Sequence, residues 1–378
     1  MKKYNQYFLI FILLAQVVAC VKPYEPAPVK ADNNYLVVDG LINASPNSET
    51  TVTLSRTKNL GDTVLFHPEL NAAVFIEAEN GGNYILQQKP NGIYSISNLT
   101  LNNNEKYRLK IFTTDGREHV SDYVPVKISP PVDSVTWRQD GDVTVYVHSH
   151  DAANNTKYYR WEYKETWEYH SPYETDMYVR NRYIYFADSN FQVYKCWDSA
   201  YSSDIVTKST INLSQDVVSN HPVAVVPKNS AKIGVRYSVL VKQYAITEEA
   251  HQFWEILKKN TEQLGTLFDP QPSQLKGNIK CISNPSEPVI GFVSASSVSE
   301  KRIFIDSSEV KDWVAYQSGS ICQTITIGLN ASDYRIFDFP DTNYSPYYFV
   351  TGGMVLLKVP CLICTTRGGT NFKPSYWR

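Results

Sequence analysis

Hydrophobic and polar positions alternate with a period of two through the first third of the chain. Residues 35–42, 50–54 and 73–78 each show this alternation, and asparagine- and glycine-containing turn sequences separate several of these runs. A period of two places every second side chain on one face, as in a strand with one buried face. The pattern predicts a mainly β protein that opens with an immunoglobulin- or fibronectin-like β-sandwich over residues 34–131.

The end of this first region gives a second indication of a sandwich. Leu99 is followed by three consecutive asparagines and then by Tyr107, which lies at the start of an alternating segment. A tyrosine in this position resembles the tyrosine corner of immunoglobulin-like domains, whose hydroxyl group bonds to backbone a few residues upstream. Pro125, Pro130 and Pro131 mark the exit from the predicted domain.

Residues 132–246 are predicted to form a second, aromatic-rich β domain that is also sandwich-like. Fifteen of the 44 residues from Tyr158 to Tyr201 are aromatic. One set recurs at every second position, interrupted only by Glu165, which favours a buried strand face. This set is Tyr159, Trp161, Tyr163, Trp167 and Tyr169.

A further set of aromatic residues is hard to accommodate in the same core. Its members lie among arginines and carboxylates, and aromatic residues mixed with arginine are typical of interface hot spots. We expect a binding surface here, with burial in the core as the alternative. The residues are Tyr173, Tyr178, Arg180, Arg182, Tyr183, Tyr185 and Tyr194.

The hydrophobic period changes at Thr247, which is suited to cap a helix. Apolar residues then recur at helical spacing from Ala250 to Leu264, and strand-like runs return at 289–293 and 301–305. Residues 247–378 are therefore expected to form one docked helix followed by a β-rich C-terminal part that carries a Cys-x-x-Cys motif.

A different pattern precedes the first predicted strand. Two lysines are followed by about a dozen mostly apolar residues, too few to span a bilayer, and the run ends in Val17-Val18-Ala19-Cys20. This ending resembles the lipobox of bacterial lipoproteins. We therefore expect residues 1–19 to be a signal peptide, Cys20 to carry the lipid that holds the protein at a membrane, and residues 20–33 to form a proline-containing tether.

Composition and charge narrow the function classes. The chain has 36 basic and 38 acidic residues, and loss of the two lysines in the signal gives a net charge of 34 − 38 = −4. This charge does not suit a nucleic-acid-binding protein. No catalytic motif, metal site or cofactor site is predicted. His148 and His150 can share one strand face, but two ligands are fewer than a zinc site uses, and His251 with Glu255 on the helix indicates packing.

Five cysteines follow Cys20, so at most two disulfides can form and one thiol stays free. A redox pair or a zinc knuckle at the Cys-x-x-Cys motif is less favoured than a structural role. We expect at least one bridge through Cys361 or Cys364, with Cys281 and Cys322 as candidate partners and Cys196 less favoured.

Taken together, these features resemble a family of Bacteroidota outer-membrane lipoproteins catalogued as a domain of unknown function, DUF4249. The resemblance rests on Cys20, residues 35–42, Gly92-Ile93-Tyr94, Cys196-Trp197, residues 291–305, and a C-terminal string that runs from Cys361 through residues 367–370 to Trp377. It implies a lipid-anchored outer-membrane location beside a TonB-dependent β-barrel transporter, and it transfers no catalytic residue.

The expected function is non-enzymatic binding as an accessory to such a transporter in nutrient uptake. The ligand class would be a glycan or a peptide, with no nucleic acid and no cofactor. A surface adhesin or carbohydrate-binding lipoprotein is the main alternative, and a hydrolase without a recognisable motif is a further one.

Overall fold

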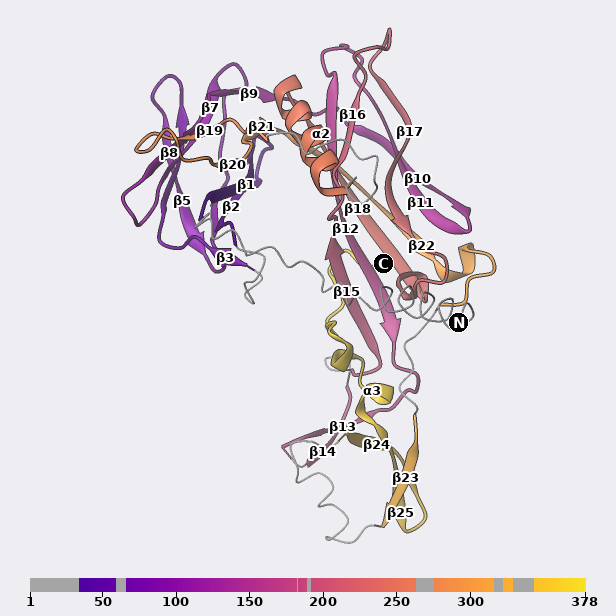
Figure 1. Ribbon diagram of the computed structural model, residues 1–378. Helices are drawn as coiled ribbons and strands as arrows, with labels where there is room; N and C mark the ends of the chain where they lie inside the picture. The colour runs from indigo at the N-terminus through magenta and orange to yellow at the C-terminus, as the bar shows by residue number, and fades with distance from the viewer. Residues whose placement is uncertain are drawn as a thin grey trace, which may run out of the picture.

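Strands form most of the regular structure. The computed structural model describes residues 34–58, 66–181, 183–188, 192–262, 275–315, 322–328 and 343–378, and the prediction of a mainly β chain is confirmed. Two α-helices occur in these ranges, α2 (Glu248–Glu262) and α3 (Val359–Leu362). No helix among the described residues is long and apolar enough to cross a membrane. Figure 1 shows two β units joined side by side and a smaller unit at the far end of the second.

The first unit is a sandwich whose strands form a closed circuit. Its successive neighbours are β7, β4, β5, β6, β2, β1, β21 and β9, and β9 pairs again with β7. Its tyrosine corner is present, because buried Tyr107 accepts a hydrogen bond from the Asn102 N–H at 2.8 Å. The early strands are β1 (Leu36–Asn43), β2 (Glu49–Arg56), β3 (His67–Pro68), β4 (Ala73–Ala78), β5 (Asn83–Lys89), β6 (Ile93–Ser97), β7 (Lys106–Phe112), β8 (Glu118–Ser121) and β9 (Val124–Lys127).

Three strands from much later in the chain complete this first unit. β19 (Ile279–Cys281) pairs with β8, and β20 (Ile290–Gly291) and β21 (Ser294–Ser296) run parallel to β1. Gly291 has a φ of 141°, and a Cβ atom there would lie 2.1 Å from the Val38 carbonyl oxygen, so the close approach to β1 requires glycine. The expectation that residues 247–378 form one separate C-terminal part is therefore wrong, since β19, β20 and β21 belong to the first sandwich.

The second unit is also a sandwich. One sheet contains β10 (Val132–Asp140), β11 (Asp142–His150) and β17 (Val217–Val226). The other contains β15 (Lys195–Tyr201), β12 (Tyr158–His170), β18 (Arg236–Ala245) and β22 (Val298–Asp306), with β16 (Val206–Ser209) also paired to β12. Valines and aromatic residues of both sheets form the core between them.

The predicted aromatic face of β12 forms part of this core. Tyr159, Trp161 and Tyr163 are buried, and Trp161 is 1% exposed. Glu165 lies on the same face and is buried too, because the Tyr237 hydroxyl donates to it at 2.8 Å and Lys232 forms an ion pair with it at 2.5 Å. A buried carboxylate with both partners supplied explains why a charged residue interrupts the aromatic pattern.

Helix α2 fills the angle between the two sandwiches (Figure 1). As predicted, Thr247 caps the helix, accepting a bond from the Ala250 N–H at 3.3 Å. Buried Ala250 packs in one cluster with Leu41 of the first sandwich and Tyr158 of the second. The helix therefore fixes the two units against each other.

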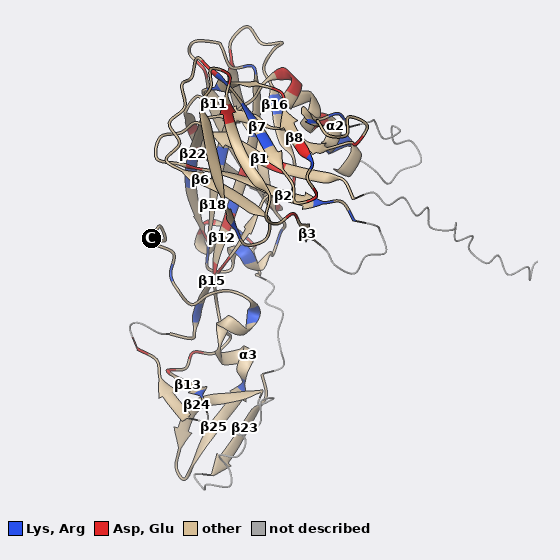
Figure 2. Ribbon diagram, turned by 90° about the vertical axis from the view of Figure 1, so that its left-hand side faces the viewer, with Lys and Arg blue, Asp and Glu red and all other residues tan. Residues whose placement is uncertain are grey.

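The smaller unit, which we call the distal module, consists of residues 172–188, 322–328 and 343–363. It contains the hairpin of β13 (Met177–Arg180) and β14 (Tyr183–Phe186), the sheet of β23 (Thr324–Gly328), β25 (Gly353–Lys358) and β24 (Tyr344–Val350), and α3. Val179 and Ile184 of the hairpin pack against Met354 and Leu356 of the sheet. The module thus has its own small core at the end of the molecule opposite the first sandwich (Figures 1 and 2).

A partly buried, neutral histidine should make the protein less stable in mild acid. Burial lowers the pKa of His221 to about 4, and its Nε2 atom has no hydrogen-bond partner. The folded pKa lies below the unfolded value of about 6.5, so the stabilisation is complete above pH 6.5 and is lost as the pH falls towards 4. We expect a loss of at most about 3 kcal/mol from this residue.

Thermal melts from pH 7.5 to 4 test this expectation. His221→Phe should flatten the dependence on pH, whereas replacement of the exposed His150, whose pKa Asp133 raises, should not. Parallel pH curves for wild type and His221→Phe would contradict the assignment.

Candidate binding surface

The hairpin of the distal module has one face towards the module's core and one face outward. Tyr178 pairs with Tyr185 and Arg180 pairs with Tyr183 across the two strands, while Val179 and Ile184 alternate with them and point inward. Because alternate residues of a strand lie on opposite faces, the three tyrosines share the outer face. The rings of Tyr178 and Tyr185 stack with centroids 5.6 Å apart.

The aromatic side chains at the end of this hairpin are largely exposed. Tyr183 is 70% exposed and Phe186 is 61% exposed, although both are large rings. On the neighbouring strand β24, Tyr348 and Phe349 are about half exposed as well. We call this set the tyrosine surface: Tyr173, Tyr178, Tyr183, Tyr185, Phe186, Tyr348 and Phe349.

The described part of the distal module as a whole carries a smaller fraction of charged residues than the full chain. The described part of the distal module contains nine aromatic residues and five charged ones, and Figure 2 shows its ribbon mostly uncharged. The charged residues are Glu174, Asp176, Arg180, Asp188 and Lys358. Aromatic enrichment with depletion of charge is the composition of the centre of a protein interface.

Most of the predicted binding residues are accessible. Tyr173, Arg180, Tyr183 and Tyr185 are exposed and Tyr178 is half-buried. Tyr194 is also half-buried, but its ring packs on His170 at 4.7 Å, outside the hairpin. Arg182 lies outside the described residues.

Phe186, Tyr348 and Phe349 were not predicted as binding residues. Phe186 continues the tyrosine-rich segment and its sequence could have indicated it. Tyr348 and Phe349 are more than 160 positions further along the chain, and only the packing of β24 beside β13 brings them near the hairpin.

A cavity of about 670 Å³ adjoins the tyrosine surface. Tyr347 and Tyr348 line one part of it, and the carboxylates of Glu174, Asp176 and Asp188 line another, with Lys195 at its edge. The Thr175 hydroxyl donates to the Pro346 carbonyl at 3.1 Å, which joins the segment before β13 to β24. The cavity is therefore held between two parts of the chain that are distant in sequence.

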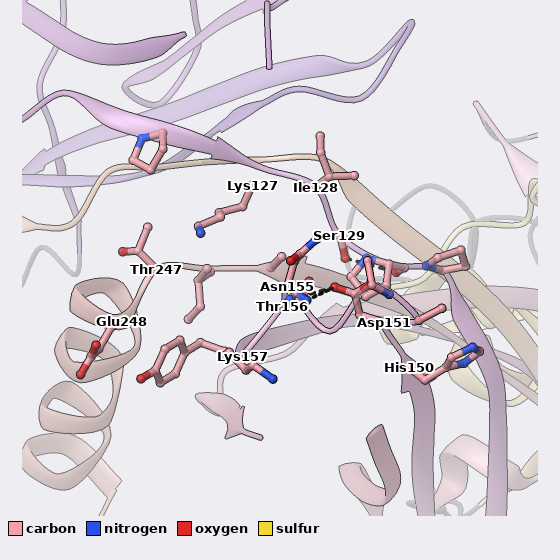
Figure 3. A pocket seen from close by; sticks show the side chains of 18 of the residues that line it. Lys127, Ile128, Ser129, His150, Asp151, Asn155, Thr156, Lys157, Thr247 and Glu248 are labelled. Carbon is pink, nitrogen blue, oxygen red and sulfur yellow. Dashed lines mark hydrogen bonds between the residues drawn. The ribbon is translucent and has the colours of Figure 1, made fainter. Parts of the chain in front are cut away.

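A second cavity, of about 1010 Å³, lies at the junction of the two sandwiches (Figure 3). Several of its polar side chains form hydrogen bonds or ion pairs that stabilise the local structure. Asp151 accepts bonds from the backbone N–H groups of Ala153, Asn155 and Thr156, which closes a tight loop, and His150 pairs with Asp133 at 2.8 Å. No described pair in this cavity has the geometry of a nucleophile and an activating base.

Comparison with known protein families gives a match over most of the chain. The family described as "Domain of unknown function (DUF4249)" matches residues 21–302. The chain belongs to this family. The DUF4249 match covers the first sandwich, most of the second and the hairpin, but it ends before β23, so the C-terminal string from Cys361 to Trp377 lies outside it.

Other comparisons add little. A search of curated proteins found no match. Among solved structures, a segment of two fibronectin type-III domains from chicken tenascin is 12% identical, with 71% of this chain and 97% of that chain covered and a TM-score of 0.17. Escherichia coli alpha-2-macroglobulin activated by porcine elastase is 11% identical over 56% of this chain and 18% of that chain, with a TM-score of 0.19. Scores this low carry no argument about fold or function.

The histidine candidates of the DUF4249 chain do not form metal sites in the described residues. His148 contacts the Thr136 hydroxyl at 3.0 Å. The His251 ring packs on Tyr158 at 5.1 Å, and Glu255 accepts a bond from Thr207. No group of three or more His, Cys, Asp or Glu side chains suited to a metal ion occurs in the part of the chain that the structure describes.

Two disulfides brace the distal module. Cys322 bonds to Cys361, and Cys364 bonds to Cys196 of β15, so the expectation of a bridge through the Cys-x-x-Cys motif is confirmed. The choice of partners is partly wrong, because Cys281 is free and buried whereas Cys196 is bridged. The long strand β12 explains this pairing, since it extends beyond the sandwich and brings β15 to the distal module.

Proposed function

We propose that this protein is a non-enzymatic binding protein of the bacterial envelope that contacts a partner protein through the tyrosine surface. The observation that carries the proposal is the exposure of Tyr183 and Tyr185 on the outer face of a hairpin whose inner face is packed. Exposed aromatic side chains on a firmly held scaffold supply large contact area at little entropic cost.

The location of the surface supports this proposal. The distal module lies at the end of the molecule remote from the first sandwich (Figure 1), and two disulfides attach and brace it. A rigid projection of this kind presents its tip to another molecule without internal rearrangement. Preorganisation reduces the cost of binding.

We further propose that Cys20 carries a lipid anchor in the outer membrane and that the partner is a TonB-dependent β-barrel transporter. The lipobox-like sequence and the resemblance to outer-membrane lipoproteins support this part. Two or more acyl chains anchor a protein stably, whereas one holds it only reversibly. An accessory role in uptake of a glycan or peptide follows from such a partnership.

The partner-binding test uses the double variant Tyr183→Ala/Tyr185→Ala. Pull-down from native membranes should recover a β-barrel transporter with the wild type, and the double variant should bind it at least 10-fold more weakly, about 1.4 kcal/mol or more. Melting temperature should change little because both rings are exposed. Tyr201→Ala is the matched control, since Tyr201 is 75% exposed on the second sandwich.

Two results would overturn this part of the proposal. In one, the double variant retains wild-type affinity. In the other, it loses several kcal/mol of stability while folded protein still binds, as expected if the rings serve the core. Turnover that is lost on mutation of an ionisable cleft residue would favour a hydrolase instead.

The anchoring test uses Cys20→Ala. Without the thiol no lipid can be attached, so the variant should remain as precursor or appear in the soluble fraction, whereas a nearby Val21→Ala control should fractionate with the outer membrane. Recovery of processed Cys20→Ala protein in outer-membrane fractions would show that anchoring does not depend on the lipobox.

A carbohydrate-binding role is the second candidate. The cavity beside the tyrosine surface combines the rings of Tyr347 and Tyr348 with the carboxylates of Glu174 and Asp176. Rings that stack on sugars and oxygens that accept from hydroxyl groups suit a glycan. Glycan-array binding that persists without any barrel partner would favour this candidate over the first.

A further inference from the structure

Two side chains that the proposed function does not use lie opposite each other in the first sandwich. His119 of β8 pairs in register with Cys281 of β19. Backbone hydrogen bonds join Asp122 to Asn278 and Ile282 to Glu118, and in an antiparallel pair such bonded positions alternate with unbonded ones. His119 and Cys281 therefore occupy an unbonded position, where facing Cβ atoms are only about 4.5–5.5 Å apart.

Both side chains are buried, and neither has an apparent structural partner. His119 is 0% exposed and Cys281 is 1% exposed. Neither ring nitrogen of His119 has a hydrogen-bond partner, and Cys281 is the cysteine that both disulfides leave free among the described residues. Burial of an imidazole without any hydrogen bond is unfavourable, so a ligand for it is expected.

Charged side chains cover this pair. Arg56 pairs with Glu69 at 2.6 Å, Arg117 pairs with Glu287 at 2.6 Å, and Arg56 and Glu287 approach each other at 3.9 Å. Glu287 and, more weakly, the Cys281 sulfur raise the pKa of Arg117, which places that guanidinium near the thiol.

We propose that His119 and Cys281 form a two-coordinate site for a soft monovalent metal ion of the Cu(I) class. Thiolate and neutral imidazole are ligands that such ions prefer. The described residues offer no third protein ligand that completes a zinc-type site. A monovalent ion bound to one thiolate gives a neutral buried unit, whereas a divalent ion would leave a net charge in the core.

Binding releases one proton and changes no oxidation state. The Cys281 S–H bond is broken, a sulfur–metal bond forms, and the proton passes to solvent while the metal remains monovalent. An uncharged His119 nitrogen donates its lone pair to the same ion. The salt bridges of Arg117 and Glu287 must open transiently to admit the ion, because the pair has almost no exposed surface.

The test titrates the purified Cys20→Ala chain, which removes the thiol at the proposed lipidation site, with Ag(I), a redox-stable ion of this class, in chloride-free buffer. Calorimetry should give one site per chain with a sub-micromolar Kd and the release of one proton. His119→Phe should weaken binding at least 10-fold, and Cys281→Ser at least 100-fold. His148→Phe, in which a half-buried histidine of the second sandwich is removed, should bind as the wild type does.

A spectroscopic measurement on the wild type tests the site without any variant, so it holds even where a variant folds poorly. X-ray absorption of the Ag(I)-loaded wild type should show one sulfur and one nitrogen bound to the metal. Absence of a stoichiometric site, a metal shell without sulfur, or wild-type affinity in folded His119→Phe would each overturn the proposal.

Discussion

Replacing Gln243 by methionine should destabilise the second sandwich by about 3–5 kcal/mol. Gln243 is fully buried on β18 at the junction of the two sandwiches. Its side-chain oxygen accepts from the Trp161 indole N–H at 2.9 Å, and its amide group donates to the Pro130 carbonyl at 2.8 Å and to the Ser149 hydroxyl at 2.9 Å. Methionine fills a similar volume but can form none of these bonds.

The cost arises from the groups that the substitution leaves behind. The Trp161 N–H would stay buried without a partner, and the Pro130 carbonyl would keep only a long bond from the Ser129 hydroxyl at 3.4 Å. Ser149 keeps its bond to the Pro131 carbonyl at 3.0 Å. Each orphaned group costs about 1–3 kcal/mol. Calorimetry should show a fall in melting temperature of roughly 10 °C.

The matched control is Gln252→Met on the exposed face of α2, which should change stability by less than about 0.5 kcal/mol. A Gln243→Met protein that melts within 2 °C of the wild type, by a rough threshold, would show that water or a local shift satisfies the two groups.

The sequence separation between interacting residues determines how much of this fold could be predicted. The period-two pattern of residues 35–42 and the tyrosine corner at Tyr107 depend on neighbours a few positions away, so the sequence indicates them directly. The aromatic face of β12 is equally local. Even the interruption at Glu165 is visible in sequence, although its partners Lys232 and Tyr237 are not.

The return of the chain to the first sandwich could not be predicted in this way. β19, β20 and β21 have two or three residues each, too few for a period to be recognised, and their partners are more than 150 positions earlier. The same limit explains the cysteine pairing. Cys196 lies in an earlier region of the sequence than Cys364. Nothing in the sequence shows that β15 pairs with the part of β12 that extends beyond the sandwich, where Cys196 meets Cys364.

The candidate binding surface was partly predictable for a related reason. Composition indicated the segment from Tyr173 to Tyr185, and the hairpin register then placed Tyr178, Tyr183 and Tyr185 on one face. The contribution of β24 depends on tertiary packing alone. An unpaired histidine such as His119 is likewise invisible in sequence, since its lack of partners is a property of the folded core.

Removing the Cys196–Cys364 disulfide should have the second large effect, a loss of up to about 5 kcal/mol from the attachment of the distal module. The bridge closes a loop with a sequence separation of 168, against 39 for Cys322–Cys361. The chain-entropy relation gives about 5 kcal/mol for the longer loop and about 4 kcal/mol for the shorter one. The variant Cys196→Ala/Cys364→Ala should therefore be the less stable of the two double variants.

Several weaker contacts remain at the same joint after the bridge is removed. The Tyr169 hydroxyl donates to the Cys364 carbonyl at 2.9 Å, Trp197 and Thr370 form a β-bridge, and the Trp377 indole N–H donates to Glu168 at 2.9 Å. These contacts should keep the module folded on average while it opens more often. Limited proteolysis should then cleave near Tyr194 or Arg367 much faster than in the wild type.

The matched control is the other double variant, Cys322→Ala/Cys361→Ala, which loses a bridge inside the module and should leave its junction with β15 protected. Equal cleavage at the junction in both variants would mean that the C-terminal contacts alone hold the module in place. The alternative result is cleavage in the Cys196→Ala/Cys364→Ala protein alone, together with weaker partner binding. It would mean that a rigid joint is needed for the tyrosine surface to bind its partner. That outcome is expected, because a surface that must first be immobilised binds with a lower net free energy than one that is already held.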